Sequence, residues 1–297
     1  MKDIQVFHYD AFATIPNQGN PAGVVLEANH LSKNEMQEIA KRVGFNETVF
    51  VTKSERADLR LNYFTPGHEI PLCGHATIAS IYALKRQGLL PDRQEWIIET
   101  NIGLLPITCS EGEPYQIKMK QGKPEFIPFG GDREQLFKAI GLCADDWDER
   151  LPIVYGSTGT WTLLVPVKKL SSFAKMVPST DKFPAILKEN PRASIHPFCL
   201  DAYDSQAHMH ARHFSSPYSG TIEDPITGTA SGVMGAYYLT YIKPELNEAN
   251  LVVEQGQELN RDGKVSVEAK KLSSREMDIF ISGTAVWVGE IDKRILE

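Results

Sequence analysis

A short motif occurs twice in this chain and constrains its fold more than any other feature. Residues 69–76 read EIPLCGHA and residues 223–230 read EDPITGTA, so the pattern E-x-P-x-x-G-x-A recurs 154 positions later in a chain of 297 residues. In each copy a proline shapes a turn, a glycine follows, and an apolar segment with helical spacing comes next. The repeat predicts two similar halves, each with this turn at the start of a helix. A duplicated fold that has kept no binding site is the alternative.

The order of the expected elements predicts an α+β fold. Strand-like and helix-like segments do not alternate regularly, which favours mainly antiparallel sheets over a doubly wound parallel sheet. Prolines and glycines are concentrated in residues 121–132 and mark the expected domain boundary. We therefore expect an N-terminal domain over residues 1–121 and a C-terminal domain over residues 132–280. A final strand within residues 281–297 is expected to return to the N-terminal domain.

Helix boundaries are clearest at residues 32–44. Ser32 and Glu35 form the pattern of a capping box, apolar residues follow at helical spacing, and Gly44 supplies a stop. The two repeated turns lead into further helices, expected over residues 76–88 and 230–242.

Charge and cysteine content limit the partners of the chain. The formal charge is −7 without a basic cluster, which argues against nucleic acid, because phosphate contacts need a concentrated positive face. No apolar stretch is long enough for a membrane span, so we also expect no membrane partner. The cysteines form no CxxC pair and no signal peptide is seen, which predicts a reduced, cytoplasmic protein. They are Cys73, Cys109, Cys143 and Cys199.

A small anionic substrate remains compatible with this charge. The unpaired N–H groups and the positive dipole end of a helix N-terminus bind a carboxylate whatever the net charge of the chain. If the two halves pack as partners, the two helix ends that follow the repeated turns would face each other across an interdomain cleft. Clefts between domains are common ligand sites.

Segments that span the chain in order resemble one known family. They are VFHYDAFATIPNQGNPAGVV, VGFNETVFV, FTPGHEIPLCGHATIAS, EDPITGTASGVMGAYYL, VEQG with RDGKVSV, and ISGTAVWVG. With this set the chain resembles the PhzF-like, or phenazine-biosynthesis-like, proteins. The resemblance implies the diaminopimelate-epimerase fold, in which two pseudo-symmetric domains each form a mainly antiparallel β-barrel around a central helix. It also implies a homodimer.

Glu47 is the first candidate for catalysis. In FNETVFV it is expected on one strand face with Phe45, Val49 and Val51, and apolar neighbours raise the pKa of a carboxyl toward the range of a proton shuttle. The pattern alone equally describes a strand-end acid that is paired or reaches solvent. The resemblance implies that this glutamate is the acid/base of the reaction.

The repeated turns carry the other candidates. His75 and Asp224 lie inside them, where a histidine can also cap or pack and an aspartate can also form a turn. The resemblance implies that both surround the substrate together with Thr229, which stands where the family has serine. The N–H groups at the start of the two helices are expected to form a cradle for the substrate carboxylate. Asn20 either lines the pocket or only fixes its own loop. The cradle residues are Gly74, Ala76, Gly228, Thr229 and Ala230.

Cys73 separates two mechanisms. Two-base epimerases of the resembled fold place one cysteine at each turn, one to remove a proton and one to return it. The second turn has Thr227 at the matching position, and a threonine hydroxyl is too weak an acid for that role. This difference favours proton transfer by a single carboxylate.

Other cofactor and metal patterns are weak. The run AHMHARH offers His208, His210 and His213, but HxH on a strand without nearby acids usually forms an exposed face. GTASGVMG has the wrong spacing for a dinucleotide-binding loop. We therefore expect neither a metal nor a cofactor.

The main hypothesis is a cofactor-independent isomerase in which Glu47 moves a proton on a small carboxylate-bearing substrate. An amino-acid epimerase or racemase that uses Cys73 is the second. A small-ligand binding protein without turnover is the third.

Overall fold

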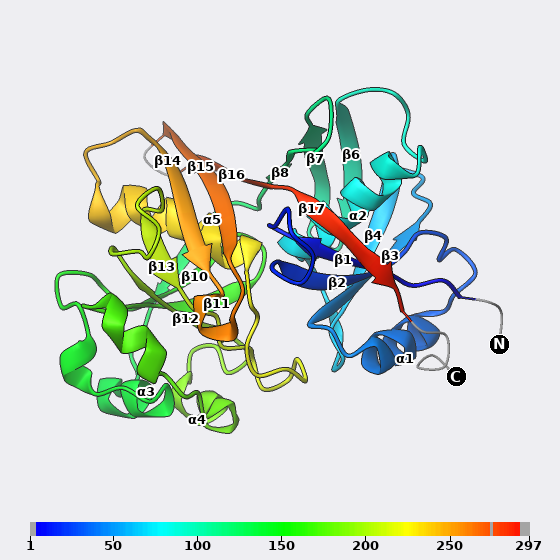
Figure 1. Cartoon of the computed structure of the whole chain (residues 1–297). Helices are drawn as coiled ribbons and strands as arrows, with labels where there is room; N and C mark the ends of the chain where they lie inside the picture. The colour runs from blue at the N-terminus through cyan, green and yellow to red at the C-terminus, as the bar shows by residue number, and fades with distance from the viewer. Residues whose placement is uncertain (1–3, 274–275, 292–297) are drawn as a thin grey trace. The chain divides into compact units, whose positions relative to one another are not determined.

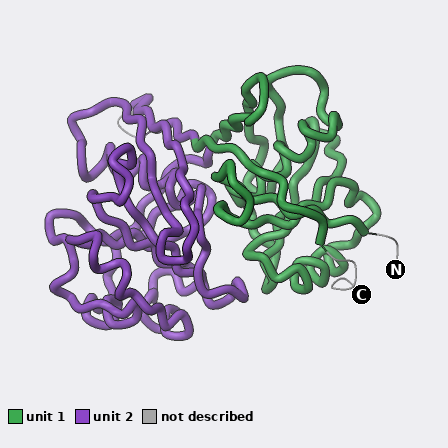
Figure 2. Tube along the Cα trace, viewed as in Figure 1, with its two compact units in different colours: residues 1–120, 281–297 green, residues 121–280 purple. Residues whose placement is uncertain are grey.

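The computed structural model describes residues 4–273 and 276–291 (Figure 1). The chain forms two compact units, one of residues 1–120 with 281–297 and the other of residues 121–280 (Figure 2). The units divide between residues 120 and 121, at the start of the expected boundary segment, and residues 121–132 open the second unit. They contain a strand, β9, which pairs antiparallel with β10.

The first unit holds most of its strands before residue 120 and receives one from the end of the chain. Its elements are β1 (Phe7–Ala11), β2 (Asn20–Val25), α1 (Lys33–Val43), β3 (Glu47–Thr52), β4 (Leu59–Phe64), β5 (Glu69–Ile70), α2 (Gly74–Arg86), β6 (Glu95–Thr100), β7 (Gly103–Cys109), β8 (Ile117–Lys120) and β17 (Ala285–Glu290).

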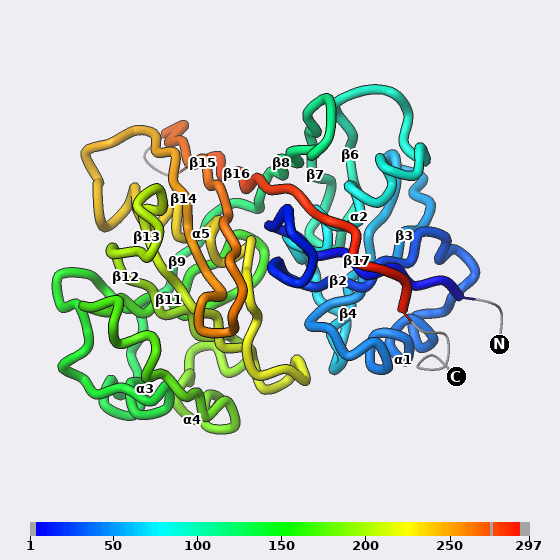
Figure 3. Tube along the Cα trace, viewed as in Figure 1, coloured from blue at the N-terminus to red at the C-terminus, as the bar shows by residue number. Residues whose placement is uncertain are grey.

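The second unit is continuous in sequence, and the chain leaves it within β16 (Figure 3). Its elements are β9 (Glu125–Pro128), α3 (Arg133–Ala139), η1 (Ala144–Asp146), β10 (Val154–Ser157), β11 (Trp161–Pro166), η2 (Leu170–Lys175), η3 (Thr180–Lys182), α4 (Phe183–Ile186), β12 (Ser194–Cys199), β13 (Met209–Ala211), α5 (Gly228–Tyr237), η4 (Tyr238–Ile242), β14 (Glu248–Gln255), η5 (Gln257–Leu259), β15 (Gly263–Ser273) and β16 (Glu276–Gly283).

Both units repeat the same order of strand pairing. In the first, β1–β2, β3–β4 and β6–β7 are antiparallel, while β2–β3 and β4–β6 are parallel. In the second, β10–β11, β12–β13 and β14–β15 are antiparallel, while β11–β12 and β13–β14 are parallel. Parallel neighbours need a crossover connection, and a helix lies within each of these four connections: α1, α2, α4 and α5. The eight-residue repeat therefore belongs to a repeat of whole units, and the mainly antiparallel α+β fold is confirmed.

One helix in each unit is buried by the curled sheet around it (Figure 1). All residues of α2 from Gly74 to Leu84 are buried, and so is every residue of α5 except Thr229. A helix that is apolar on all sides is stable only when enclosed in this way. The helix expected over residues 230–242 ends as an α-helix at Tyr237 and continues as the π-helix η4.

The first helix forms as its sequence predicts. In α1 the Ser32 side chain accepts a hydrogen bond from the N–H of Glu35, and the Glu35 side chain accepts one from the N–H of Ser32. Gly44 ends the helix with a φ of 73°. None of the helices in the described part of the chain combines the length and the apolar character that crossing a membrane demands.

Candidate functional site

Two elements of the first unit bring Glu47 and His75 together. Glu47 is the first residue of β3 and His75 is the second residue of α2. Glu47 Oε2 lies 3.3 Å from His75 Nε2, and the two side chains are 14% and 2% exposed. An acid and a base at this distance can pass a proton between them. Phe45 does not share a strand face with Glu47 as expected, because β3 begins at Glu47; the Phe45 ring contacts His8 instead, with a centroid distance of 4.5 Å.

Asn20 sets the orientation of the His75 ring. It is fully buried at the start of β2, and its Nδ2 lies 3.0 Å from His75 Nδ1. An amide nitrogen can only donate, so in this arrangement Nδ1 accepts and the ring of neutral His75 carries its proton on Nε2, facing Glu47. Asn20 thus acts on the acid–base pair through the histidine.

Cys73 also lies next to the His75 ring. It is the N-cap residue of α2, it is buried, and its Sγ is 3.3 Å from His75 Nδ1. Its carbonyl is fixed, because Thr77 Oγ1 donates to it at 2.6 Å and Tyr63 donates to Thr77 Oγ1 at 2.6 Å. Burial raises the pKa of the Tyr63 hydroxyl and keeps it protonated as a donor. These two hydrogen bonds therefore hold the turn that carries Cys73 and His75 in place.

The start of each central helix has no side-chain cap. The N-cap residues are Cys73 for α2 and Thr227 for α5, and neither side chain bonds to the helix N–H groups. The first N–H groups of a helix have no partner within the helix, so an uncapped end suits a carboxylate. Gly74 and Ala76 lie in the first turn of α2, and Gly228, Thr229 and Ala230 lie in the first turn of α5.

The second turn is built around Asp224. Its carboxylate accepts from Thr227 Oγ1 at 2.5 Å, so the hydroxyl at the position matching Cys73 orients an acid. Gln255 holds both residues: its Oε1 accepts from Thr227 N at 3.1 Å and its Nε2 donates to the Asp224 carbonyl at 2.7 Å. Ser231 Oγ donates to the Thr227 carbonyl at 2.9 Å, as Thr77 does to Cys73 in the first unit.

The predicted site residues thus form two groups, one in each unit. The first unit gathers Asn20, Glu47, His75 and the first turn of α2, and the second gathers Asp224 and the first turn of α5. Sequence reasoning missed Gln255 as the residue that holds the second turn. The only signal for it was its place in VEQG, a segment of the family resemblance.

The histidines of AHMHARH do not form the exposed face that their spacing suggested. His208 is exposed, but His210 is fully buried between Glu254 and Glu258, at 2.9 and 3.2 Å. Burial disfavours the charged ring of His210, yet the two carboxylates outweigh it and raise its pKa. Burial lowers the pKa of His213 to about 4. Both glutamates are more than forty positions away in sequence, so no local pattern revealed them.

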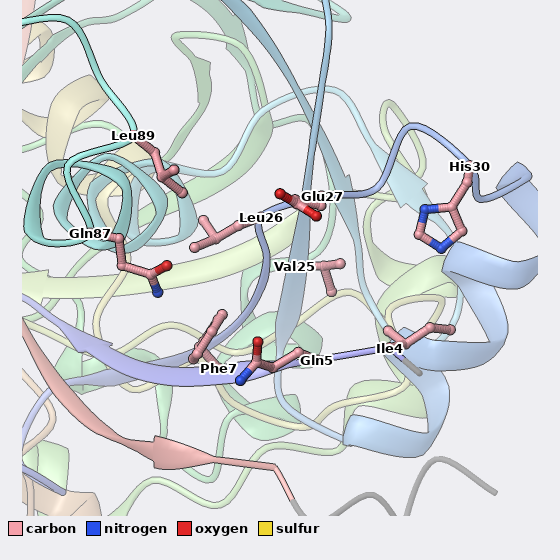
Figure 4. Close-up of a pocket in the computed structure, with 9 residues that line it drawn as sticks. All are labelled: Ile4, Gln5, Phe7, Val25, Leu26, Glu27, His30, Gln87 and Leu89. Carbon is pink, nitrogen blue, oxygen red and sulfur yellow. The ribbon is translucent and has the colours of Figure 1, made fainter. Parts of the chain in front are cut away.

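A cavity of about 320 Å³ lies elsewhere in the first unit (Figure 4). Phe7 of β1, Val25 of β2 and Leu89 after α2 are among its apolar lining residues, and Glu27 and His30 are among its polar ones. None of the predicted site residues lines it.

The structure is thus of two similar α+β units, the first with a glutamate–histidine pair at the start of its buried helix. The family model described as "Phenazine biosynthesis-like protein" matches residues 9–290. The chain belongs to this family.

Individual relatives agree over nearly the full length. The uncharacterized isomerase YfhB of Bacillus subtilis is 49% identical over 288 residues, which cover 97% of each chain. The crystal structure of a PhzF-family protein of Bacillus anthracis matches with a TM-score of 0.92 at 55% identity, covering 98% of this chain and 99% of that one. The trans-2,3-dihydro-3-hydroxyanthranilate isomerase of Pseudomonas chlororaphis is 26% identical, over 95% of this chain and 97% of its own. The chain is an enzyme of the isomerase class, of the PhzF type.

Proposed function

We propose that the enzyme moves a proton on a small carboxylate-bearing substrate and that Glu47 is the single acid/base. The observation that carries the proposal is the 3.3 Å approach of Glu47 Oε2 to His75 Nε2 beside the uncapped start of α2. A carboxylate that is largely enclosed, held next to a proton donor and next to an anion-binding helix end is suited to this chemistry.

The proposed reaction needs no co-reactant. The Glu47 carboxylate takes a proton from a C–H bond of the substrate, and the electron pair of that bond is delocalised over the adjacent unsaturated system. The protonated Glu47 then returns the proton to a different carbon of the same molecule. The bond that breaks and the bond that forms are both C–H, so the product is an isomer and Glu47 is regenerated. His75, with its proton on Nε2, stabilises the carboxylate form of Glu47 before the first step and after the second.

Substrate binding is proposed for the first turns of both central helices. In the first unit the N–H groups of Gly74 and Ala76 would hold a carboxylate, and Asn20 keeps His75 in place. In the second unit the same role is proposed for the first turn of α5, Gly228–Ala230. There Asp224, oriented by Thr227, is proposed as an acid/base or hydrogen-bonding group for the substrate.

The substrate class is proposed from this chemistry and from one relative. The relative named for trans-2,3-dihydro-3-hydroxyanthranilate acts on a cyclic carboxylate, and an unsaturated ring carboxylate offers both the anion and the delocalising system that the mechanism needs. We also propose a homodimer, on the family resemblance, which light scattering of the purified protein would test. The cysteine pattern is the ground on which we propose a location in the cytoplasm.

A second candidate is an epimerase or racemase that uses Cys73. The observation that favours it is the distance of 3.3 Å between Cys73 Sγ and His75 Nδ1, because an imidazole can take the proton of a thiol. Such an epimerase would return a proton to the same carbon of the substrate. Thr227 at the matching position donates its own proton to Asp224, which speaks against a second base there.

Deuterium wash-in from heavy water separates these functions. Cyclic and amino carboxylates are incubated with the enzyme, and the position of the label is read by NMR. The main proposal predicts label at a carbon other than the one that lost hydrogen, with exchange dependent on Glu47. Label at the original carbon with inverted configuration, lost in Cys73→Ala and after thiol alkylation, would instead establish the epimerase. Binding without exchange for every compound would contradict both.

A further inference from the structure

Three side chains of the first unit present different metal-ligand atoms to one point. Glu47, Cys73 and His75 each offer one ligand atom, and the three atoms lie within 4.8 Å of one another. Elsewhere in residues 4–273 and 276–291 no comparable group of three occurs. This cluster was not visible in the sequence, because Glu47 lies on the strand β3, 28 positions before His75 in the helix α2.

The distance between Glu47 and His75 matches tetrahedral zinc. Zinc bonds of about 2.3 Å to sulfur and about 2.0–2.1 Å to nitrogen or oxygen place neighbouring ligand atoms about 3.3–3.6 Å apart. His75 Nε2 lies 3.3 Å from Glu47 Oε2 and 3.9 Å from Cys73 Sγ. The third pair, Cys73 Sγ and the Glu47 ligand oxygen, lies within 4.8 Å, so the Cys73 side chain would move toward both other ligands when the metal binds.

The chemistry of the ligands also selects the ion. A thiolate, an imidazole and one carboxylate bind Zn²⁺ and Co²⁺, whereas Mg²⁺ and Ca²⁺ need several oxygen ligands. When His75 binds through Nε2, its proton moves to Nδ1, and the buried amide of Asn20 can turn to accept it through its oxygen. A hydrogen-bonded partner of this kind is the usual support of a zinc-bound histidine.

We propose that Glu47, Cys73 and His75 bind one Zn²⁺ and that bound zinc inhibits the isomerase. Binding releases the proton of the Cys73 thiol, because the thiolate is the ligand. The Glu47 oxygen that would accept the substrate proton is then occupied by the metal. The inhibition rests on the proposed function of Glu47, whereas the binding does not.

Cobalt titration tests the site itself. The reduced full-length protein is titrated with Co²⁺, and thiolate ligation is read from its near-ultraviolet charge-transfer band. We expect one Co²⁺ per chain, displaced by an equivalent of Zn²⁺. The band should persist in Cys143→Ala, which removes an exposed thiol remote in sequence, and vanish in Cys73→Ala. Absence of the band in the wild-type protein, or its persistence in Cys73→Ala, would overturn the proposal.

Two further measurements keep the binding and the inhibition apart. Asn20→Ala is expected to weaken Zn²⁺ binding by about 10–100-fold, the usual effect of removing such a support, and unchanged affinity would contradict the assigned ligand geometry. Zinc added to the wild-type enzyme should abolish deuterium exchange, and a chelator should restore it. If zinc binds and Glu47→Gln still exchanges fully, the proposed function fails while the metal site stands. If no zinc binds, the metal site fails whatever the activity of Glu47→Gln.

Discussion

Thr77 holds the turn of Cys73 and His75 through two hydrogen bonds, and the cost of losing them can be estimated. Thr77 donates to the Cys73 carbonyl and accepts from the buried Tyr63 hydroxyl, both at 2.6 Å. Thr77→Val keeps the shape of the side chain but removes both bonds. The lost bond to the carbonyl costs about 0.5–1.5 kcal/mol, and the Tyr63 hydroxyl left without a partner costs about 1–3 kcal/mol. We therefore expect Thr77→Val to lower the free energy of unfolding by about 2–4 kcal/mol.

Removing the Tyr63 hydroxyl as well should restore part of the lost stability. In the double variant Tyr63→Phe/Thr77→Val no buried donor is left over at this point, so it is expected to be more stable than Thr77→Val alone by about 1–3 kcal/mol. Ser231→Ala is the matched control in the second unit. Ser231 donates to the Thr227 carbonyl at 2.9 Å, and we expect its loss to cost only the single bond, about 0.5–1.5 kcal/mol.

Urea unfolding of the four proteins, followed by far-ultraviolet circular dichroism, measures these differences. If Tyr63→Phe destabilises the Thr77→Val protein further, so that the two costs add, the reasoning about a stranded hydroxyl is refuted.

Two further predictions concern the second unit, one of them with a control in β17 of the first unit. Glu254→Gln breaks the buried pair with His210 and should cost about 3–5 kcal/mol in urea unfolding. Burial raises the pKa of Glu254, but hydrogen bonds with His210 and two backbone N–H groups outweigh burial and lower that pKa. The contribution of Glu254 to the free energy of unfolding is therefore present above the ordinary carboxyl pKa and lost as the pH falls. The stability of Glu254→Gln should accordingly fall less steeply with decreasing pH than that of the wild type. In α5, a Cβ at Gly235 would lie 2.6 Å from Val267 Cγ1. Gly235→Ala should therefore overpack this contact, reduce the free energy of unfolding by about 1–3 kcal/mol and lower the melting temperature. Gly289→Ala, with open space around the added Cβ, is the control and should change stability by less than about 0.5 kcal/mol. An equal effect of the two glycine variants would contradict the close approach.

The sequence predicts the local features of this fold well, since they depend on neighbouring residues. The capping box of Ser32 and Glu35 and the stop at Gly44 form as their spacing indicates. The repeated turns also precede buried helices as expected. These features follow from backbone hydrogen bonding and glycine geometry, which a short window of residues determines.

Features that join distant segments were not predictable in the same way. The prolines and glycines of residues 121–132 indicated a domain boundary but did not reveal the strand of residues 125–128, which forms through pairing with β10. His210 looked exposed because its acidic partners come from β14 and η5. The pairing of Glu47 with His75 was implied by the family resemblance, whereas Gln255 behind the second turn was not anticipated. Such contacts depend on strand order, which no local pattern encodes.

The most direct test of the account is the exchange rate of Glu47→Gln. Its substrate is the compound that wild-type enzyme labels fastest in heavy water, and Glu55→Gln, an exposed glutamate of the same unit, is the control. If Glu47 is the acid/base, Glu47→Gln should exchange about 10²–10⁴-fold more slowly while still binding the compound, and Glu55→Gln should match the wild type. Exchange by Glu47→Gln at the wild-type rate would contradict the account.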